Sequence, residues 1–317
     1  MKAPAFWESD NALALMMAPL GHLYALGGRW RRQAATPWQA PVPVICVGNL
    51  TVGGTGKTPT AVALARRLAV IGCKPVLVSR GYRGRLGGPV RVDPRTHLAA
   101  DTGDEPLLLA EAAPTIVAKD RIAGVRAAVE LGAEVIVLDD GFQDPRLRHD
   151  LALVVVDAGA GFGNGRVLPA GPLREPISEG LARADAIVLI GDGGIDTSRP
   201  LWRARLVPNE ASLRFRGIRV FGFAGIGRPG KFFATLREIG AEVVAARAFP
   251  DHHPYDEDIA ALLIEEAARL GATPVTTRKD WVRLPVSARS MVSVVDVDLS
   301  FADEDAVMRR LKDLRRG

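Results

Sequence analysis

The stretch Val44-Ile45-Cys46-Val47-Gly48-Asn49-Leu50-Thr51-Val52-Gly53-Gly54-Thr55-Gly56-Lys57-Thr58 decides the fold of this chain. It begins with an apolar, β-branched run that is typical of a buried strand. A glycine-rich turn follows, and Gly-Lys-Thr leads into a helical segment at residues 59–68. Strand, glycine loop, Lys-Thr and helix in this order predict a phosphate-binding loop, or P-loop. We therefore expect an α/β fold with a P-loop NTPase-like, mostly parallel sheet.

The chemistry of this loop predicts a nucleotide with Mg²⁺. Backbone N–H groups of the loop and of the helix N-terminus form an anion site. Lys57 would contact the β- and γ-phosphates, and the Thr58 hydroxyl would hold the metal. The strict motif has glycine where this chain has Thr51. The predicted nucleotide-binding residues of the loop are Thr51, Val52, Gly53, Gly54, Thr55, Gly56, Lys57 and Thr58. The alternative is a chance Gly-Lys-Thr in an ordinary βα turn.

Acidic residues follow or begin two further elements. The apolar run 135–138 ends in Asp139 and Asp140, as a Walker B strand does, at the strand end where α/β sheets bind ligands. Asp104 and Glu105 open a helix, where acidic side chains commonly only stabilise the helix dipole. Beside a P-loop, they could also serve Mg²⁺ or a hydroxyl group.

Composition narrows the class of protein. The formal net charge is +5, and the basic residues are mostly arginines scattered along the chain, so nucleic-acid binding is not favoured. The two cysteines form neither a CxxC pair nor a metal spacing, which suits a reducing compartment. We predict no secretory signal and no transmembrane helix. The apolar segment 6–32 ends in arginines, and it is either a membrane-interface helix or a helix packed on its own domain.

The order of predicted elements divides the chain into four segments. These are an N-terminal apolar segment at 1–35, a P-loop nucleotide-binding domain at 36–200, a β-hairpin linker at 201–216 and a smaller α/β domain at 217–317. The linker is predicted from two alternating runs around Pro208-Asn209, at 202–207 and 212–215. A strand, a glycine loop and a helix then recur from Val220.

Two motifs of the smaller domain bear on function. His252 and His253 are adjacent rather than four residues apart, so a zinc site is not supported. They form either a polar turn or a catalytic histidine supplied by the second domain. Thr276-Thr277-Arg278-Lys279-Asp280 superficially matches the guanine-reading motif of GTPases, but Arg278 occupies the lysine position. Guanine specificity is therefore not supported.

Seven blocks together resemble one family over nearly the whole chain. They are Val47 to Pro59, Ser79-Arg80-Gly81-Tyr82, Gly103-Asp104-Glu105-Pro106, Asp139-Asp140-Gly141-Phe142-Gln143, Leu168 to Pro176, Asp251-His252 and Thr276 to Asp280. Their order and spacing resemble the tetraacyldisaccharide 4'-kinases, the lipid A 4'-kinases. Thr51 in the P-loop also resembles this family. The sequence departs from it after Gln143, where Asp144 and His149-Asp150 stand.

The resemblance implies transfer of the ATP γ-phosphate to the 4'-hydroxyl of a tetraacylated glucosamine disaccharide 1-phosphate. It implies a peripheral enzyme at the cytoplasmic face of a bacterial inner membrane, with the lipid substrate and the membrane surface as partners. Neither a nucleic acid nor an obligate protein partner is expected. Because an acylated substrate does not readily leave the bilayer, the resemblance favours the membrane-interface reading of the N-terminal segment.

The resemblance also implies roles for individual residues. Asp104 resembles the general base on the 4'-hydroxyl, His252 its orienting partner, and Asp140 a member of their hydrogen-bond network. Asp139 would complete the metal shell of Thr58, with Glu105 as a further candidate. Arg174 and Glu175 resemble loop residues near the nucleotide and the substrate. Since Asp104 and His252 belong to different predicted domains, we expect domain closure to assemble the pair.

Two other functions remain as alternatives at this point. One is a P-loop GTPase or metallochaperone, a regulatory module, which the guanine-motif mismatch and the lack of a Cys/His cluster disfavour. The other is a soluble kinase for a small molecule, with the N-terminal segment packed into its core.

Overall fold

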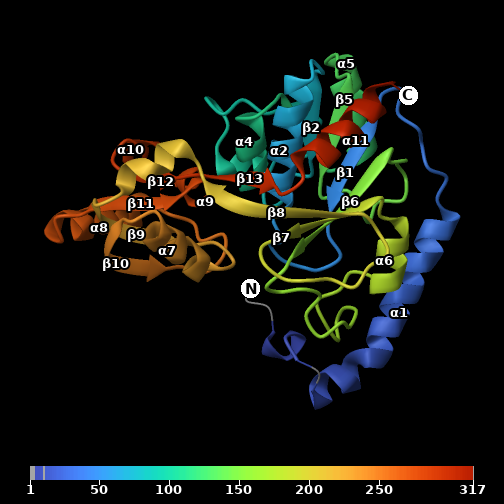
Figure 1. Ribbon diagram of the computed structural model, residues 1–317, viewed down its shortest axis with the longest axis horizontal. Helices are drawn as coiled ribbons and strands as arrows, with labels where there is room; N and C mark the ends of the chain where they lie inside the picture. The colour runs from blue at the N-terminus through green and yellow to red at the C-terminus, as the bar shows by residue number, and fades with distance from the viewer. Residues whose placement is uncertain (1–3, 10, 317) are drawn as a thin grey trace.

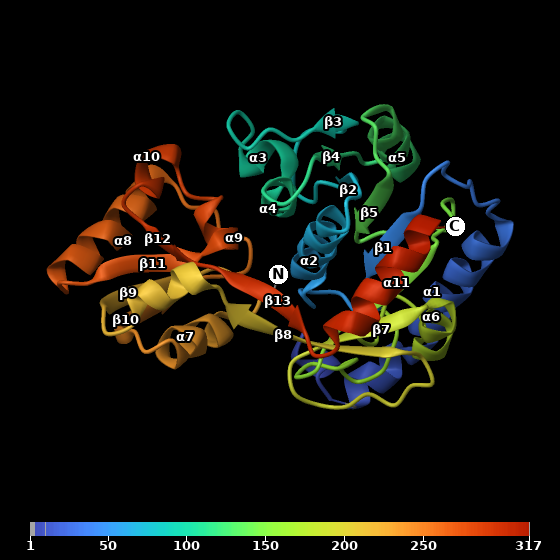
Figure 2. The same cartoon turned by 45° about the horizontal axis from the view of Figure 1, so that its top comes forward.

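The computed structural model describes residues 4–9 and 11–316. The outermost residues of the predicted segments 1–35 and 217–317, and Asp10, lie outside the described residues. The chain forms two lobes that are joined by the long strands β8 and β13 (Figures 1 and 2). Both lobes are α/β, so the predicted fold class is confirmed.

The larger lobe is built on a mostly parallel sheet. Within the described residues this sheet has nine strands in the order β13-β8-β7-β6-β1-β5-β2-β4-β3. The strands are β1 (Val44–Gly48), β2 (Pro75–Ser79), β3 (Val90–Arg91), β4 (Thr115–Val117), β5 (Val135–Asp139), β6 (Leu151–Asp157), β7 (Ala186–Ile190), β8 (Leu201–Pro208) and β13 (Val297–Phe301). The P-loop strand β1 lies between β5 and β6, which places the glycine loop at the middle of the carboxyl edge.

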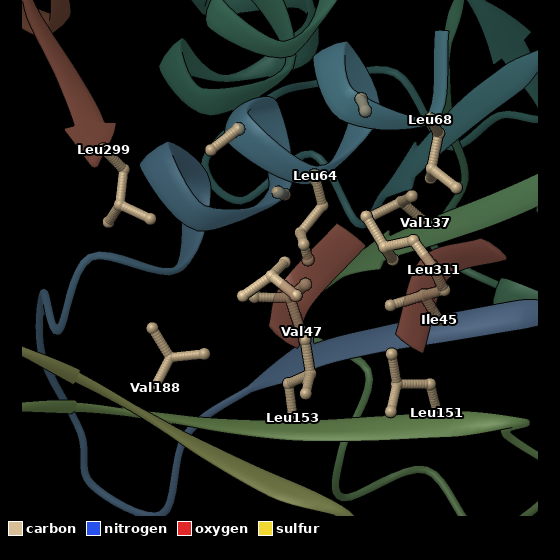
Figure 3. Close-up of a cluster of buried hydrophobic side chains, with 14 of the residues drawn as sticks. Ile45, Val47, Leu64, Leu68, Val137, Leu151, Leu153, Val188, Leu299 and Leu311 are labelled. Carbon is tan, nitrogen blue, oxygen red and sulfur yellow. The ribbon is translucent and has the colours of Figure 1, made fainter. Parts of the chain in front are cut away.

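Helices cover both faces of this sheet. Side chains of β1 alternate between the two faces, and all five of its residues are buried, so both faces must be covered. On one face lie α2 (Lys57–Val70), α4 (Asp104–Ala110) and α11 (Glu304–Arg316), and on the other α5 (Arg121–Glu130) and α6 (Ile177–Arg183). Figure 3 shows Ile45 and Val47 of β1 facing Leu64 and Leu68 of α2. The short helix α3 (Ala99–Thr102) precedes α4.

The smaller lobe repeats the α/β plan. Its described sheet is parallel, in the order β10-β9-β11-β12. Its elements are β9 (Arg219–Ala224), α7 (Pro229–Glu238), β10 (Glu242–Ala248), α8 (Glu257–Arg269), β11 (Thr273–Thr277), α9 (Arg278–Trp281), α10 (Val286–Arg289) and β12 (Ser293–Val295). Phe232 and Leu236 of α7 pack on one side of the sheet, and Leu263 of α8 packs on the other.

The predicted hairpin at 201–216 is wrong. Residues 210–215 form the 3₁₀ helix η2 (Glu210–Phe215), because the Asn209 side chain caps it by accepting the backbone N–H of Ser212. Phe215 is buried in the smaller lobe. The antiparallel partner of β8 is instead the distant β13, and β7 pairs with its other edge in parallel. Two strands do connect the lobes, but they come from opposite ends of the smaller lobe's sequence.

The predicted extent of the smaller domain, 217–317, is also wrong at its end. Strand β13 returns to the larger lobe, and α11 then packs on the core around β1. Leu299 and Leu311 both point into that core (Figure 3). Arg67 of α2 holds Glu304 at 2.6 Å. The apolar side of α11 is therefore buried against the P-loop helix rather than against the smaller lobe.

The N-terminal segment contains the 3₁₀ turn η1 (Ala5–Trp7) and the helix α1 (Ala12–Ala34), which lies along the outside of the larger lobe beside α6 (Figure 1). Arg32 of α1 donates to Glu179 of α6 at 2.7 Å. The buried face of α1 consists of small residues, and its large apolar side chains are exposed: Leu13, Leu15, Met16, Leu20, Leu23, Tyr24, Leu26 and Trp30. Among the described residues, no helix has the length and apolarity that crossing a membrane requires.

Candidate active site

A cleft of about 2040 Å³ separates the two lobes. The P-loop, the ends of β5, β6 and β7, and residues of α7 and α9 line it, and it extends to Leu23 and Arg31 of α1. The carboxyl ends of parallel strands are where α/β proteins bind ligands. The cleft therefore joins the predicted phosphate site to the exposed apolar helix.

The backbone of the P-loop depends on glycine at its last turn. Gly56 precedes α2 with a φ angle of +95°, and a Cβ atom there would overlap Cδ1 of Ile190. At the start of the loop, the Asn49 side chain donates to the carbonyl of Thr51 at 2.7 Å. Thr51 itself is buried and bridged to Leu173, outside the lining of the cleft. Thr51 therefore anchors the start of the loop to Leu173 and does not face the cleft.

Gly56→Ala is expected to destabilise the protein and weaken nucleotide binding, because positive φ and the Ile190 contact both oppose a side chain. We expect a loss of about 2 kcal/mol in the free energy of unfolding. Gly54→Ala is the matched control for stability, since its Cβ would meet nothing within 4 Å and its φ is not positive. Thermal unfolding with and without ATP measures both effects, and equal melting temperatures for the two variants would contradict this account.

Thr58 and Asp139 meet at the base of the cleft. The Thr58 hydroxyl donates to Asp139 Oδ2 at 3.0 Å. Asp139 Oδ1 and Glu105 Oε2 are buried without a hydrogen-bond partner among the described residues. Burial raises the pKa of Asp139 to about 7, against the opposing charge of Lys57. Buried carboxylate oxygens without donors are favourable for a hard divalent cation, so these residues fit Mg²⁺.

Lys57 and Asp140 form the next layer of charges. Lys57 Nζ lies 3.8 Å from Asp140 Oδ2. Arg174 holds the same carboxylate with two contacts, of 2.9 and 3.3 Å. Burial favours the neutral acid, but the charges of Lys57 and Arg174 outweigh it and lower the pKa of Asp140. Asp140 thus positions two cations that point into the cleft.

Asp104 and His252 form a pair between the two lobes. His252 Nδ1 lies 2.9 Å from Asp104 Oδ2, although the residues are 148 positions apart. Asp104 begins α4 in the larger lobe, and His252 lies in the loop after β10 in the smaller one. His253 is stacked on Phe249 at 4.5 Å between ring centres, within the core of the smaller lobe. The structure thus separates the two histidines, and His252 faces the cleft.

A family model described as Tetraacyldisaccharide-1-P 4'-kinase matches residues 13–316. The chain belongs to the tetraacyldisaccharide 4'-kinase family. It is 51% identical to the tetraacyldisaccharide 4'-kinase of Rhodospirillum centenum over 100% of this chain and 98% of that protein. It is 52% identical to that of Methylorubrum extorquens strain PA1, over 98% of each chain.

A solved structure agrees with this membership. The crystal structure of LpxK from Aquifex aeolicus in complex with ATP is similar over 95% of this chain and 99% of that chain, with 28% identity and a TM-score of 0.78. As a member of the tetraacyldisaccharide 4'-kinase family, the chain is a phosphotransferase of lipid A biosynthesis. The alternatives of a regulatory GTPase or metallochaperone and of a soluble small-molecule kinase are therefore set aside.

Two cations of this kinase's smaller lobe were not assigned a role from the sequence. Lys279 Nζ lies 2.9 Å from Glu105 Oε1, and Arg283 Nε lies 3.5 Å from Asp104 Oδ2. Lys279 belongs to the block Thr276 to Asp280, but nothing in that block indicates contact with a carboxylate of the other lobe. Arg283 belongs to none of the seven blocks. Only the packing of α9 against α4 brings them there.

Glu175, predicted near the nucleotide, does not line the cleft of this kinase. It is 1% exposed and accepts hydrogen bonds from Arg183 at 2.5 Å and Gln143 at 3.3 Å. Its neighbour Arg174 does reach the cleft. Glu175 therefore anchors the loop through Arg183 and Gln143, while Arg174 faces the ligand side.

A second ion-pair cluster ties the lobes of the kinase together. Asp157, at the end of β6, accepts from Lys231 at 2.7 Å and from Arg228 at 3.0 Å, both in the smaller lobe. Burial opposes ionisation, but the hydrogen bond from Lys231 and the charge of Arg228 outweigh it and hold the pKa of Asp157 below its ordinary value. The contacts of Asp157 with Lys231 and Arg228 therefore stabilise the docked lobes when Asp157 is ionised.

Asp157→Asn is expected to lower stability at neutral pH by about 1 kcal/mol, since both cations are half-exposed and screened. A carboxylate with a lowered folded-state pKa stabilises above its unfolded pKa and loses that effect as the pH falls. The difference from wild type should therefore shrink below about pH 4. Melting temperatures across pH measure it, with the exposed Asp192→Asn as control. A difference that does not depend on pH would contradict the assignment.

Proposed function

We propose that this kinase transfers the γ-phosphate of ATP, with Mg²⁺, to the 4'-hydroxyl of a tetraacylated glucosamine disaccharide 1-phosphate, using Asp104 as the general base. The observation that carries the proposal is the 2.9 Å pair of Asp104 and His252, whose imidazole lines the same cleft as Lys57, Thr58 and Asp139. A base must stand within reach of the acceptor hydroxyl while the donor phosphate is held opposite, and this cleft supplies both groups.

ATP as the donor is supported by the P-loop and by the relative from Aquifex aeolicus, whose structure contains ATP. The N–H groups that open α2 would face the phosphates, and Lys57 would contact the β- and γ-phosphoryl oxygens. Arg174 reaches the same space from its anchored loop. Phosphoryl transfer depends mainly on such positioning and charge stabilisation.

Thr58 and Asp139 would hold Mg²⁺, with Glu105 as a further ligand. The unpartnered oxygens of Asp139 and Glu105 support this assignment. Bound there, Mg²⁺ would neutralise charge on the phosphates of the donor. Asp140 would act one layer further out, through Lys57 and Arg174.

Asp104 would accept the proton of the 4'-hydroxyl while the hydroxyl oxygen forms its bond to the γ-phosphorus. The bond from that phosphorus to the β–γ bridging oxygen breaks, and ADP leaves. Burial alone would raise the pKa of Asp104, but the hydrogen bond with His252 and the charge of Lys279 lower it on balance. Asp104 is thereby kept ionised and ready to accept a proton. The contact with His252 also fixes the orientation of the carboxylate.

The reaction is tested by transfer of label from γ-labelled ATP to a tetraacylated disaccharide 1-phosphate in detergent micelles. We expect labelled lipid with ATP, much less with GTP, and none with a 4'-deoxy acceptor. Label on the 4'-deoxy acceptor would refute the 4'-hydroxyl as nucleophile. Equal transfer to a fully deacylated disaccharide would refute a lipid acceptor.

We also place the enzyme at the cytoplasmic face of the inner membrane, peripherally, through α1. Met16 and Trp30 on this helix are 77% and 74% exposed. Burying such side chains at the headgroup boundary is favourable, and arginines close the helix at its C-terminal end. Leu23 and Tyr24 belong both to the exposed face and to the lining of the cleft. An acyl chain could therefore remain near the bilayer while its sugar enters the cleft.

Replacing Met16 and Trp30 together by glutamate is expected to reduce binding to anionic vesicles by at least about 10-fold, because two buried side chains are lost and two like charges are added. Vesicle co-sedimentation measures the binding. Leu262→Glu is the control, since Leu262 is also exposed, at 54%, but lies on α8 of the smaller lobe. Equal loss in the control, or none in the α1 variant, would argue against this membrane contact.

A further inference from the structure

The ammonium of Lys279, in α9, lies close to three groups: the carboxylates of Asp104 and Glu105 and the imidazole of His252. Its ammonium lies 2.9 Å from Glu105 Oε1, 4.0 Å from Asp104 Oδ2 and 3.4 Å from His252 Nε2. Its side chain is only one-quarter exposed. One ligand atom each of Asp104, Glu105 and His252 lie within 4.8 Å of one another, a spacing that is also compatible with a metal ion. Lys279 already supplies a cation to this cluster.

The contact with His252 constrains where the imidazole proton lies. An ammonium group has only donors, so a ring nitrogen that faces it at hydrogen-bond distance must accept and must lack a proton. In a neutral imidazole the other nitrogen then carries the proton. That nitrogen is Nδ1, which lies 2.9 Å from the Asp104 carboxylate. Asp251 Oδ2 is 3.8 Å from Nε2, which is beyond hydrogen-bond distance.

We propose that Lys279 is a positioning residue that fixes His252 in the tautomer protonated at Nδ1, so that the ring donates to Asp104 and orients it toward the acceptor. The value of this to catalysis rests on the proposed function of Asp104 as base. Asp104 Oδ2 is occupied by His252, and no hydrogen bond to Oδ1 is found among the described residues. Oδ1 is then the oxygen that receives the proton. Holding a histidine in the correct tautomer is a large contribution in other acid–base sites.

The test reads the tautomer directly, by ¹⁵N NMR of protein labelled at histidine, in the absence of substrate and metal. The ring signals of His252 are identified by their loss in His252→Gln. We expect one unprotonated Nε2 and one protonated Nδ1 in wild type. In Lys279→Met the Nε2 signal should move toward the value of a protonated nitrogen, because no cation faces it any longer, while Nδ1 stays protonated against Asp104. The kcat should fall by about 10-fold or more, with the KM for ATP within about 2-fold.

Lys231→Met is the matched control, because it removes another lysine that bridges the lobes, through Asp157, without touching His252. Its His252 ring signals should remain those of wild type. Lys279→Arg should keep the wild-type tautomer, since a guanidinium is also only a donor, and should recover part of kcat. Unchanged His252 signals in folded Lys279→Met would overturn the proposal, and so would the same change in Lys231→Met.

If Lys279→Met does not fold, Lys279→Cys alkylated with 2-bromoethylamine restores an ammonium at nearly the same reach. Recovery of the wild-type tautomer and of kcat together supports the proposal, and recovery of neither overturns it. The alkylated wild-type protein controls for Cys46 and Cys73, which are both buried. Because the NMR measurement needs no turnover, an active Asp104→Asn enzyme would refute the base assignment and leave the tautomer result standing.

Discussion

Asp104→Asn is expected to lower kcat by about 10³-fold while changing the KM for ATP little. The amide occupies the same volume but cannot accept the 4'-hydroxyl proton, and general-base catalysis typically contributes 10²–10⁴ in rate. The donor site remains, because Lys57 and Thr58 lie on α2 rather than on α4. Steady-state kinetics in micelles with the lipid acceptor measure both constants.

Asp101→Asn is the matched control for this experiment. Asp101 lies three residues earlier and pairs with Arg85 rather than with His252. Its kcat should stay within about 2-fold of wild type. His252→Ala should cost less than Asp104→Asn, and the double variant should be little worse than Asp104→Asn alone, because the two residues act as one unit. A fully active Asp104→Asn enzyme would sink the assignment of the base.

Lys57→Met is expected to lower kcat/KM for ATP by about 10²–10³-fold. The change removes the ammonium that would contact the transferred phosphoryl group, and one well-placed donor in a closed site is worth about this much. Of the two cations that hold Asp140, Lys57 and Arg174, the variant keeps only Arg174. Kinetics at saturating lipid, with ATP varied, measure the loss.

Lys74→Met serves as the control lysine for Lys57→Met. It follows α2 at the protein surface, with its side chain 77% exposed and a loose ion pair to Glu134. Activity should stay at the wild-type level. If Lys57→Met instead bound and turned over ATP normally, the loop at Gly56 would not be the donor site, whatever its shape.

Much of the donor half of the site could be predicted, because it is local in sequence. The glycine loop, Lys57 and Thr58 are consecutive in the sequence. Asp139 is the last residue of the neighbouring strand β5, whose apolar pattern predicts a buried strand. The acceptor half was predicted from the family resemblance rather than from geometry. Its contacts join α4 to the loop after β10 and to α9, and no local pattern encodes the distance between them.

The errors have the same origin. Alternation at 212–215 also fits a 3₁₀ turn, and only burial of Phe215 with the Asn209 cap selects the turn. The partner of β8 had to be chosen between a neighbour in sequence and β13, and pairing over long separations leaves no mark on the strand itself. Glu175 is adjacent to Arg174 in the sequence but is held away from the cleft, because Arg183 binds its carboxylate inside the loop.

The strand, loop and helix around Gly56 follow from local sequence alone, since β-branched residues, positive-φ glycines and a helix start act within a few residues. Tertiary structure decided that His252 rather than His253 meets Asp104, that Lys279 reaches both, and that α11 returns to the core of β1. The physical reason is that these contacts come from packing two lobes along β8 and β13. The free energy of such contacts depends on which surfaces meet, and a local pattern does not record that.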